Sequence, residues 1–276
     1  MFIQGKSGAG AKKFHTAGFS ARRMSFKRFP GRSWLVIFAV LFLFLCGWSD
    51  ASADPFKIPE KFVYDLTWTG IKAGTASLEL ICNGDEVRIV STARSADWLS
   101  LFYTVEDRAE SILSRNPSGS ELGLPTQYRL KVREGRHRKD KEVFFDRHHN
   151  RARYIDHLSK KEKDYEVPDS VLDPISSFYH LRLMDLVVGK PVYVTIFDSK
   201  KVWNVEVQVL GKERITVPVG TFDTILVKPL MKSEGIFYRK GEIFIWLTDD
   251  AKRIPVKMQT KVAVGSITAS LVHSSY

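Results

Sequence analysis

Cysteine is nearly absent from this chain of 276 residues, which contains only Cys46 and Cys82. Cys46 lies at the end of an N-terminal apolar run that we expect to be removed with a targeting segment. Cys82 would then be the only cysteine of the mature protein, and one cysteine cannot form an internal disulfide. The fold must therefore be stabilised by its core, even in an oxidising compartment.

The N-terminal apolar run is too short for an ordinary membrane span. It covers Trp34 to Leu45, with the sequence WLVIFAVLFLFL. A bilayer span takes about 20 apolar residues, whereas the core of a secretory signal takes about 7–15. Lys27, Arg28 and Arg32 supply a positive region before the run. This order of a positive region and a short apolar core is typical of a secretory signal.

The residues after this run complete the signal. Ala51-Ser52-Ala53 has the small-x-small pattern that signal peptidase recognises, so we predict cleavage after Ala53. The predicted signal segment covers 1–53, with Met24 as an alternative start, and the predicted location is the periplasm. An uncleaved segment would instead anchor the protein in the inner membrane.

Beyond the signal segment there is little excess of positive charge. The whole chain has a formal net charge of +11, with 42 Lys and Arg against 31 Asp and Glu. Residues 1–53 hold eight of the basic residues and one acidic residue, which leaves 34 basic and 30 acidic residues, a net charge of +4. The basicity therefore belongs to the targeting segment, and we predict no nucleic-acid partner.

Catalytic signatures are missing too. The sequence has no G-x-S-x-G nucleophile elbow, and the glycine-rich string at Gly5 lacks phosphate-loop spacing. His137, His148, His149 and His157 lie near carboxylates, but the adjacent His148 and His149 would face opposite sides of a strand. We therefore predict no catalytic residues, no cofactor and no metal.

What the mature region does contain is alternation of apolar and polar residues. Phe62, Tyr64 and Leu66 alternate with polar or smaller side chains, and similar strings recur about every ten residues to the C-terminus. This period of two is typical of strands with one buried face. We predict a single mainly β domain over 54–276, built as a curved antiparallel meander, barrel or half-barrel with one helix packed on it.

The expected helix covers residues 173–187. Asp173 can cap it, and Pro174 suits its first position, where no backbone N–H is required. Tyr179 and Arg182 are three residues apart and so share one face. We expect that face to pin the helix to the sheet, and Gly189 to follow the end of the helix.

Three strings give the chain a family resemblance. They are FVYDL from Phe62 with AGTA from Ala73, DPISSFY from Asp173 with Arg182, and WLTDD from Trp246 with RIPV from Arg253. In order and spacing they resemble the bacterial envelope family called domain of unknown function (DUF) 3108, over essentially the whole mature chain. The resemblance implies an exported, β-rich protein, and no activity or catalytic residue comes with it.

A basic hairpin is the first candidate site. Arg129, Lys131 and Arg133 would point to one side of a strand about 6–7 Å apart, which suits a phosphate-bearing or other anionic ligand. The alternative is a solvated hairpin whose charges keep a sheet edge from pairing with other chains.

An aromatic cluster is the second candidate. Trp98, Phe102 and Tyr103 lie close together in the string DWLSLFYTV. If the sheet curls into a half-open barrel, they could line an apolar cavity for an acyl chain, whereas the alternative is a place in the ordinary core.

Four acidic residues suggest a third, enzymatic reading. Asp107, Asp173, Asp249 and Asp250 could act in pairs as hydrolytic acids and bases if they shared a cleft. Asp249 and Asp250 follow an expected strand, however, where aspartate commonly forms turns, and Arg253 could pair with either of them.

The leading functional prediction is a non-enzymatic periplasmic module. It would bind an apolar or amphiphilic envelope ligand, a lipid or glycolipid, with the basic hairpin near an anionic headgroup. The alternative is an assembly protein that binds another envelope protein, and an Asp-dependent hydrolase comes third. The oligomeric state and the identity of the ligand stay open, and membrane contact is expected only through the signal segment or peripherally.

Overall fold

The computed structural model describes residues 58–83, 86–115, 122–230, 242–261 and 265–275. The chain divides into two units, 1–51 and 52–276, and all described residues belong to the second unit. The predicted signal segment 1–53, with its cleavage after Ala53, lies outside them. Within the described residues, no helix is long and apolar enough to cross a membrane.

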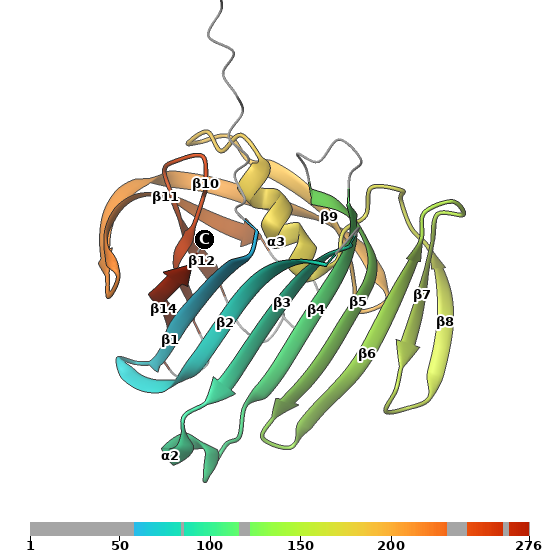
Figure 1. Ribbon diagram of the computed structural model, residues 1–276, viewed down its shortest axis with the longest axis horizontal. Coiled ribbons are helices and arrows are strands. Elements are labelled where there is room, and N and C mark those ends of the chain that lie inside the picture. Colours follow the sequence, from blue (N-terminus) through green and yellow to red (C-terminus); the bar gives the residue numbers. More distant parts are fainter. Residues whose placement is uncertain (1–57, 84–85, 116–121, 231–241, 262–264, 276) are drawn as a thin grey trace, which may run out of the picture. The chain divides into compact units, whose positions relative to one another are not determined.

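In the described part of the chain, fourteen strands form one antiparallel sheet, whose arrangement is drawn in Figure 1. In chain order they are β1 (Glu60–Trp68), β2 (Ile71–Asn83), β3 (Glu86–Ser95), β4 (Glu106–Arg115), β5 (Leu122–Glu134), β6 (His137–Asp146), β7 (Arg151–Asp156), β8 (Lys161–Glu166), β9 (Val192–Asp198), β10 (Lys201–Val217), β11 (Gly220–Leu230), β12 (Ile243–Thr248), β13 (Pro255–Lys261) and β14 (Ser266–Ser275).

The sheet is a meander in two arms. Its strand order is β8-β7-β6-β5-β4-β3-β2-β1-β14-β13-β12-β11-β10-β9, so β1 and β14 join the arms and β8 and β9 are the two edges. The sheet is therefore not closed. Each arm is built from hairpins between consecutive strands, which confirms the predicted mainly β, curved antiparallel architecture.

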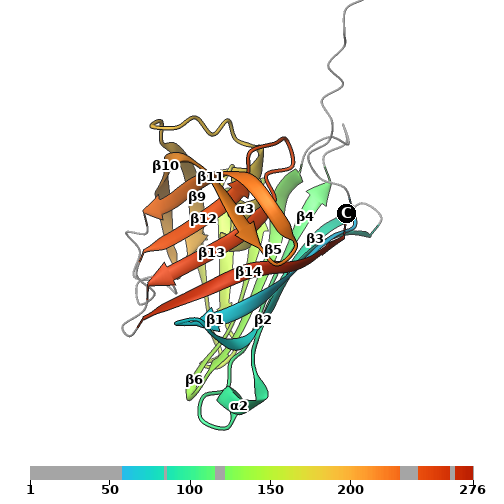
Figure 2. The same ribbon diagram turned by 90° about the vertical axis from the view of Figure 1, so that its left-hand side faces the viewer.

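Within the described residues, two helices accompany the sheet instead of the one expected. The longer, α3 (Pro174–Leu183), connects β8 to β9 and lies across one face of the sheet (Figures 1 and 2). The shorter, α2 (Asp97–Ser100), is a single turn between β3 and β4. A stretch of four residues is too short to give a helical period in the sequence.

The β9 edge packs against the inner face of the other arm. The Phe197 ring lies 6.3 Å from that of Phe145 on β6 and 5.5 Å from that of Tyr165 on β8, measured between centroids. Next to it, Asp198 forms a buried ion pair with Lys141 of β6. The open sheet thus overlaps itself, which buries apolar side chains that a flat sheet would leave in water.

Helix α3 begins as predicted. The Asp173 carboxylate accepts hydrogen bonds from the backbone N–H groups of Ile175 (2.9 Å) and Ser176 (3.0 Å). Ser176 Oγ accepts in return from the Asp173 N–H at 3.1 Å, so the two residues form a capping box. The helix ends at Leu183, earlier than the predicted residue 187, because Met184 already has extended backbone dihedral angles.

The expected anchoring of this helix is confirmed. Arg182 is buried and makes a two-pronged ion pair with Glu60 of β1, at 2.7 Å and 2.9 Å. It also donates to the backbone carbonyl of Arg253 at 3.1 Å, and its guanidinium lies 5.0 Å from the centre of the Tyr179 ring. These contacts hold α3 to both arms of the sheet, at β1 and at the segment before β13.

Candidate functional site

An apolar cavity of about 380 Å³ lies between α3 and the inner face of the sheet. Its lining comes from both arms and from the helix. The residues are Tyr64, Ala76, Ser77, Leu78, Ser91, Ala109, Tyr128, Leu130, Pro174, Ile175, Ser177, Phe178, Leu181, Val194, Ile196, Val205, Val207, Pro229, Ile243, Ile245 and Met258.

The size of the inner side chains explains why a cavity remains. Ala76 on β2, Ser91 on β3 and Ala109 on β4 contribute small side chains to its lining. Protein interiors are normally packed to near-crystalline density, with few voids larger than a water molecule. A space of about 380 Å³ instead falls within the range of ligand pockets, about 300–1,000 Å³.

Several polar groups of the lining are already engaged within the protein. The Tyr64 hydroxyl donates to the Pro255 carbonyl at 2.9 Å, and Ser177 Oγ donates to the Pro174 carbonyl at 2.9 Å. Because these groups are satisfied, the surface that they offer to a ligand is largely apolar.

A buried polar cluster lies at the start of α3. Ser111 on β4 donates to the Asp173 carboxylate at 2.6 Å, and both residues are fully buried. Burial raises the pKa of Asp173, and the hydrogen bonds from Ser111 and Ser176 oppose that rise. Nearby, burial lowers the pKa of Arg147 to about 10, while Asp173 and Asp169 act in the opposite direction.

Replacements of Asp173 should separate its cap from its charge. Asp173→Ala is expected to lower the free energy of unfolding by about 1–2 kcal/mol, because it removes the N-cap. Asp173→Asn keeps an acceptor and should cost much less near neutral pH. Because the folded pKa of Asp173 is raised, its contribution to stability is fully present below the ordinary pKa of about 4 and is lost as pH rises through the raised value.

Urea denaturation at a series of pH values, starting near the ordinary aspartate pKa, checks this prediction. Asp173→Asn should lack the part of the pH dependence that Asp173 contributes, and Asp164→Asn, on the exposed edge strand β8, is the control. Equal losses for the alanine and asparagine variants would contradict the assigned capping role.

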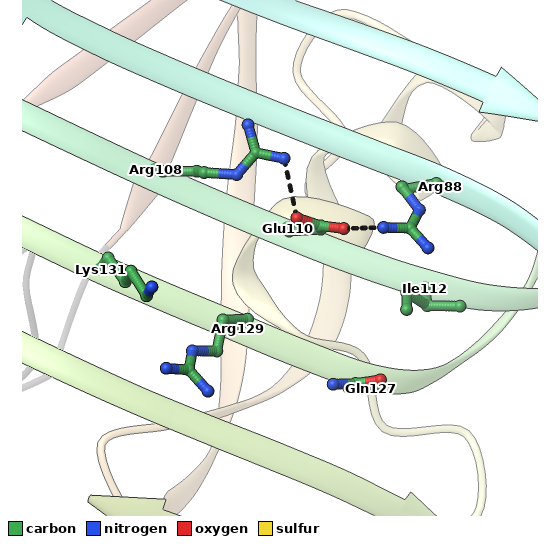
Figure 3. A pocket seen from close by; sticks show the side chains of 7 residues that line it. All are labelled: Arg88, Arg108, Glu110, Ile112, Gln127, Arg129 and Lys131. Atoms are coloured by element: carbon green, nitrogen blue, oxygen red, sulfur yellow. Dashed lines mark hydrogen bonds and ion pairs between the residues drawn. The ribbon is translucent and has the colours of Figure 1, made fainter. Parts of the chain in front are cut away.

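The outer face of the sheet carries a second hollow, of about 300 Å³, over β3, β4 and β5 (Figure 3). Glu110 lies at its centre, with Arg88 and Arg108 turned towards its carboxylate. The Arg108–Glu110 distance is 2.9 Å. The hollow is lined by Arg88, Arg108, Glu110, Ile112, Gln127, Arg129 and Lys131.

The predicted basic residues are placed on this outer face. Arg129 and Lys131 line the hollow together, whereas Arg133 lies outside it and is 3.4 Å from Glu106. Arg129 is already paired with Asp140 at 2.7 Å and with Glu142 at 2.8 Å. These carboxylates partly neutralise the positive charge of the basic hairpin.

The basic hairpin and the apolar cavity lie on opposite faces of β5. Tyr128 and Leu130 line the cavity, and the residues between and beside them, Gln127, Arg129 and Lys131, line the outer hollow. The sequence-based picture in which these cations hold the headgroup of a ligand in the cavity is therefore not supported, because alternate side chains of a strand face opposite ways.

The aromatic cluster does not line the cavity either. Trp98, Phe102 and Tyr103 come together around α2, with 44%, 84% and 47% of their surfaces exposed. The Trp98 indole N–H donates to the Lys72 carbonyl at 2.9 Å, which ties this loop to β2. The predicted lining of the cavity by these residues is therefore wrong. Three aromatic residues close together in a sequence can lie in an exposed loop as well as in a core.

The four aspartates each have a local structural role. Asp107 accepts from the Arg133 N–H at 3.0 Å, Asp173 caps α3, and Asp249 pairs with Arg253 at 3.3 Å, as anticipated for the turn. Asp250 accepts from the N–H groups of two residues that follow it in the same turn. Within the described ranges, no cluster of three or more His, Cys, Asp or Glu side chains is suited to a metal ion.

Two solved structures are similar to this one to different extents, and the first of them shows the fold. A β-barrel-like protein of domain of unknown function DUF1849 from Brucella abortus is 13% identical, with a TM-score of 0.50, covering 79% of this chain and 97% of that chain. A protein with a YmcC-like fold from Bacteroides fragilis is 10% identical, with a TM-score of 0.32, covering 80% of this chain and 98% of that chain. A search of the curated proteins gives no match.

The family comparison agrees with the three strings seen in the sequence. The profile of DUF3108, described as a protein of unknown function, matches residues 63–272, which run from β1 to β14 and include α3. The chain therefore belongs to the DUF3108 family.

Proposed function

We propose that this protein is a periplasmic binding module that holds the apolar part of an amphiphilic envelope molecule, a lipid or glycolipid, in the cavity between α3 and the sheet. The observation that carries the proposal is the cavity itself, about 380 Å³ in volume and lined mainly by aliphatic and aromatic side chains. A polar ligand would gain little binding free energy from such a lining, whereas an acyl chain would be transferred out of water on entering it.

The location in the proposal rests on the N-terminal segment. A positive region, a short apolar run and Ala51-Ser52-Ala53 have the order of a secretory signal. An envelope protein with an apolar cavity has amphiphiles as its most abundant apolar neighbours. A lipid or glycolipid is therefore the ligand class that suits both features.

Filling the cavity tests the proposal. Ala109→Phe places a ring in the space between β4 and α3, and should weaken binding of a fluorescent fatty-acyl probe by about tenfold or more, a loss of at least about 1.4 kcal/mol. The matched control is Ile112→Phe, on the same strand but on the outer face.

The protein would be purified from its own envelope fraction, and native mass spectrometry would be run alongside the probe titration. A co-purifying lipid in the unmodified protein and in Ile112→Phe, but not in Ala109→Phe, is the expected result. Equal probe affinity in all three folded proteins would show that the cavity is not the binding site.

A second candidate function is the assembly of an envelope complex. It is favoured by the exposed apolar loop around α2, where Leu101 and Phe102 have 81% and 84% of their surfaces exposed. Exposed apolar groups gathered in one place are a common feature of protein contact sites. Cross-linking from this loop would identify a partner, and Leu101→Ser should abolish that cross-link without changing binding of the acyl probe.

A further inference from the structure

Tyr128 differs from Tyr64 and Ser177, the cavity residues whose hydroxyls donate to backbone carbonyls. It is on β5 with only 2% of its surface exposed, and it lines the cavity beside Leu130. Unlike the Tyr64 hydroxyl, which donates to the Pro255 carbonyl, its hydroxyl has no hydrogen-bond partner in the described part of the chain. Buried tyrosine hydroxyls normally find a partner, because an unpaired hydroxyl loses its hydration without replacement.

This hydroxyl is also accessible. The buried side-chain atoms that lack both a partner and contact with solvent do not include the Tyr128 hydroxyl. Since this hydroxyl has no partner in the described structure, it keeps some accessible surface. Tyr128 is almost wholly buried and lines the cavity, so the cavity is the open space beside its side chain. A molecule in the cavity is therefore in a position to supply the missing hydrogen bond.

The charges around Tyr128 favour an uncharged partner. Burial raises the pKa of Tyr128 well above its usual value, and the nearby carboxylates of Asp198 and Asp173 raise it further. The phenol thus stays protonated and neutral, and the same carboxylates would repel an anionic group placed beside it. Lys141, 5.8 Å from the centre of the Tyr128 ring, is already paired with Asp198.

We infer that the cavity selects chains bearing an uncharged oxygen, a hydroxyl or an ester carbonyl, which hydrogen-bonds to the hydroxyl of Tyr128, in preference to free fatty acids. The inference rests on the proposed function and adds the chemical class of the ligand to it. An ester-linked acyl chain meets the requirement through its carbonyl, and a long-chain alcohol meets it through its hydroxyl.

The test compares three probes with the same sixteen-carbon chain: methyl palmitate, hexadecanol and palmitate. Each would displace a fluorescent acyl probe from the protein purified from the envelope at pH 7.5. Both neutral probes should bind more tightly than palmitate in the unmodified protein. In Tyr128→Phe they should lose about threefold to tenfold in affinity, as expected for one hydrogen bond, while palmitate should be unchanged.

Two controls keep the result interpretable. Tyr193→Phe, on β9 with 53% of its surface exposed, should leave all three affinities unchanged. When both proteins have been stripped of bound lipid, the urea denaturation midpoint of Tyr128→Phe should equal or exceed that of the unmodified protein, because its hydroxyl has no partner in the described structure to lose. A clear drop in the midpoint would reveal such a partner and overturn the inference.

The outcomes separate the inference from the proposed function. In one outcome, Ala109→Phe prevents binding of all three probes, but Tyr128→Phe binds each probe as the unmodified protein does. In another, Ala109→Phe again prevents binding, but the unmodified protein binds palmitate most tightly. Either outcome has the same meaning. The role of Tyr128 is then wrong and the cavity remains the site. If no probe binds the unmodified protein, both are wrong. If ester and alcohol respond differently to Tyr128→Phe, the one that loses affinity identifies the group that contacts the hydroxyl.

Discussion

Replacing Arg182 with methionine is expected to lower the free energy of unfolding by about 3–5 kcal/mol, because the change leaves the Glu60 carboxylate buried without its cation. In the ion pair, 0% of the Arg182 side chain and 3% of the Glu60 side chain are exposed. The arginine also donates to the carbonyls of Lys252 and Arg253, at 3.0 Å and 3.1 Å. One substitution would thus remove four hydrogen bonds that join α3, β1 and the loop before β13.

Urea denaturation followed by tryptophan fluorescence would measure this loss. Arg153→Met is the matched control, because its ion pair with Glu162 is exposed at 56% and 46% of the two side chains. Exposed pairs contribute about 0–1 kcal/mol. The double variant Glu60→Leu with Arg182→Met should regain much of the stability, since it leaves no buried charge. A single variant as stable as the control would show that the pair is not needed for the fold.

Replacing Lys141 with methionine should have an effect of similar size, about 3–5 kcal/mol. Lys141 on β6 and Asp198 on β9 are each only 5% exposed, and their ion pair joins the edge strand β9 to a strand of the other arm. Without the lysine, the Asp198 carboxylate would remain buried, and among the described residues only the Ser199 hydroxyl, at 3.0 Å, would remain as its side-chain partner. We expect the β9 edge to open locally, because opening exposes the unpaired Asp198 carboxylate to water.

Hydrogen exchange would locate that opening. Amides of β9 and of α3 should exchange faster in Lys141→Met, whereas those of β1 to β3 should change little. Asp198→Asn combined with Lys141→Met removes both charges and should restore part of the protection. Uniform acceleration over the whole sheet would contradict a local role and would indicate that the pair stabilises the fold globally.

The strands and the start of α3 were predictable because their signals are local. The alternation of Phe62, Tyr64 and Leu66 follows from the pleat of a strand, and Asp173 with Pro174 is a local helix start. The end of the helix was missed, because Met184 leaves the helical conformation well before the glycine that suggested the stop. The partners of Arg182 come from remote segments, so the sequence could indicate the anchoring face but not Glu60.

The candidate site was less predictable because its lining depends on strand register. Ala76, Ser91 and Ala109 leave a space only because three separate strands bring them to one side of the sheet, opposite α3. Small residues in three strands are no signal before that register is known. The predicted lining, Trp98, Phe102 and Tyr103, depended on local hydrophobicity alone, which an exposed loop and a core share.

The basic hairpin shows both what alternation predicts and what it omits. Arg129 and Lys131 do share one face, as their spacing required. The neutralising partners of Arg129 could not be seen, because Asp140 and Glu142 lie on the facing strand β6. The face that the cations occupy was also undetermined until Tyr128 and Leu130 were found to line the inner cavity.

The pairing of β1 with β14 has a consequence for how the chain reaches this fold. Lys61 faces Ser275 and Trp68 faces Ile267, so β1, the first of the described strands, completes its hydrogen bonds only when β14 has been synthesised. Until then β1 keeps one row of backbone donors and acceptors open, while β2 to β8 can already pair as hairpins. Contacts between such distant segments fold slowly, and an open edge invites pairing with other chains. Until β14 has paired with it, β1 is therefore a strand edge at which the unfinished sheet can pair with other chains.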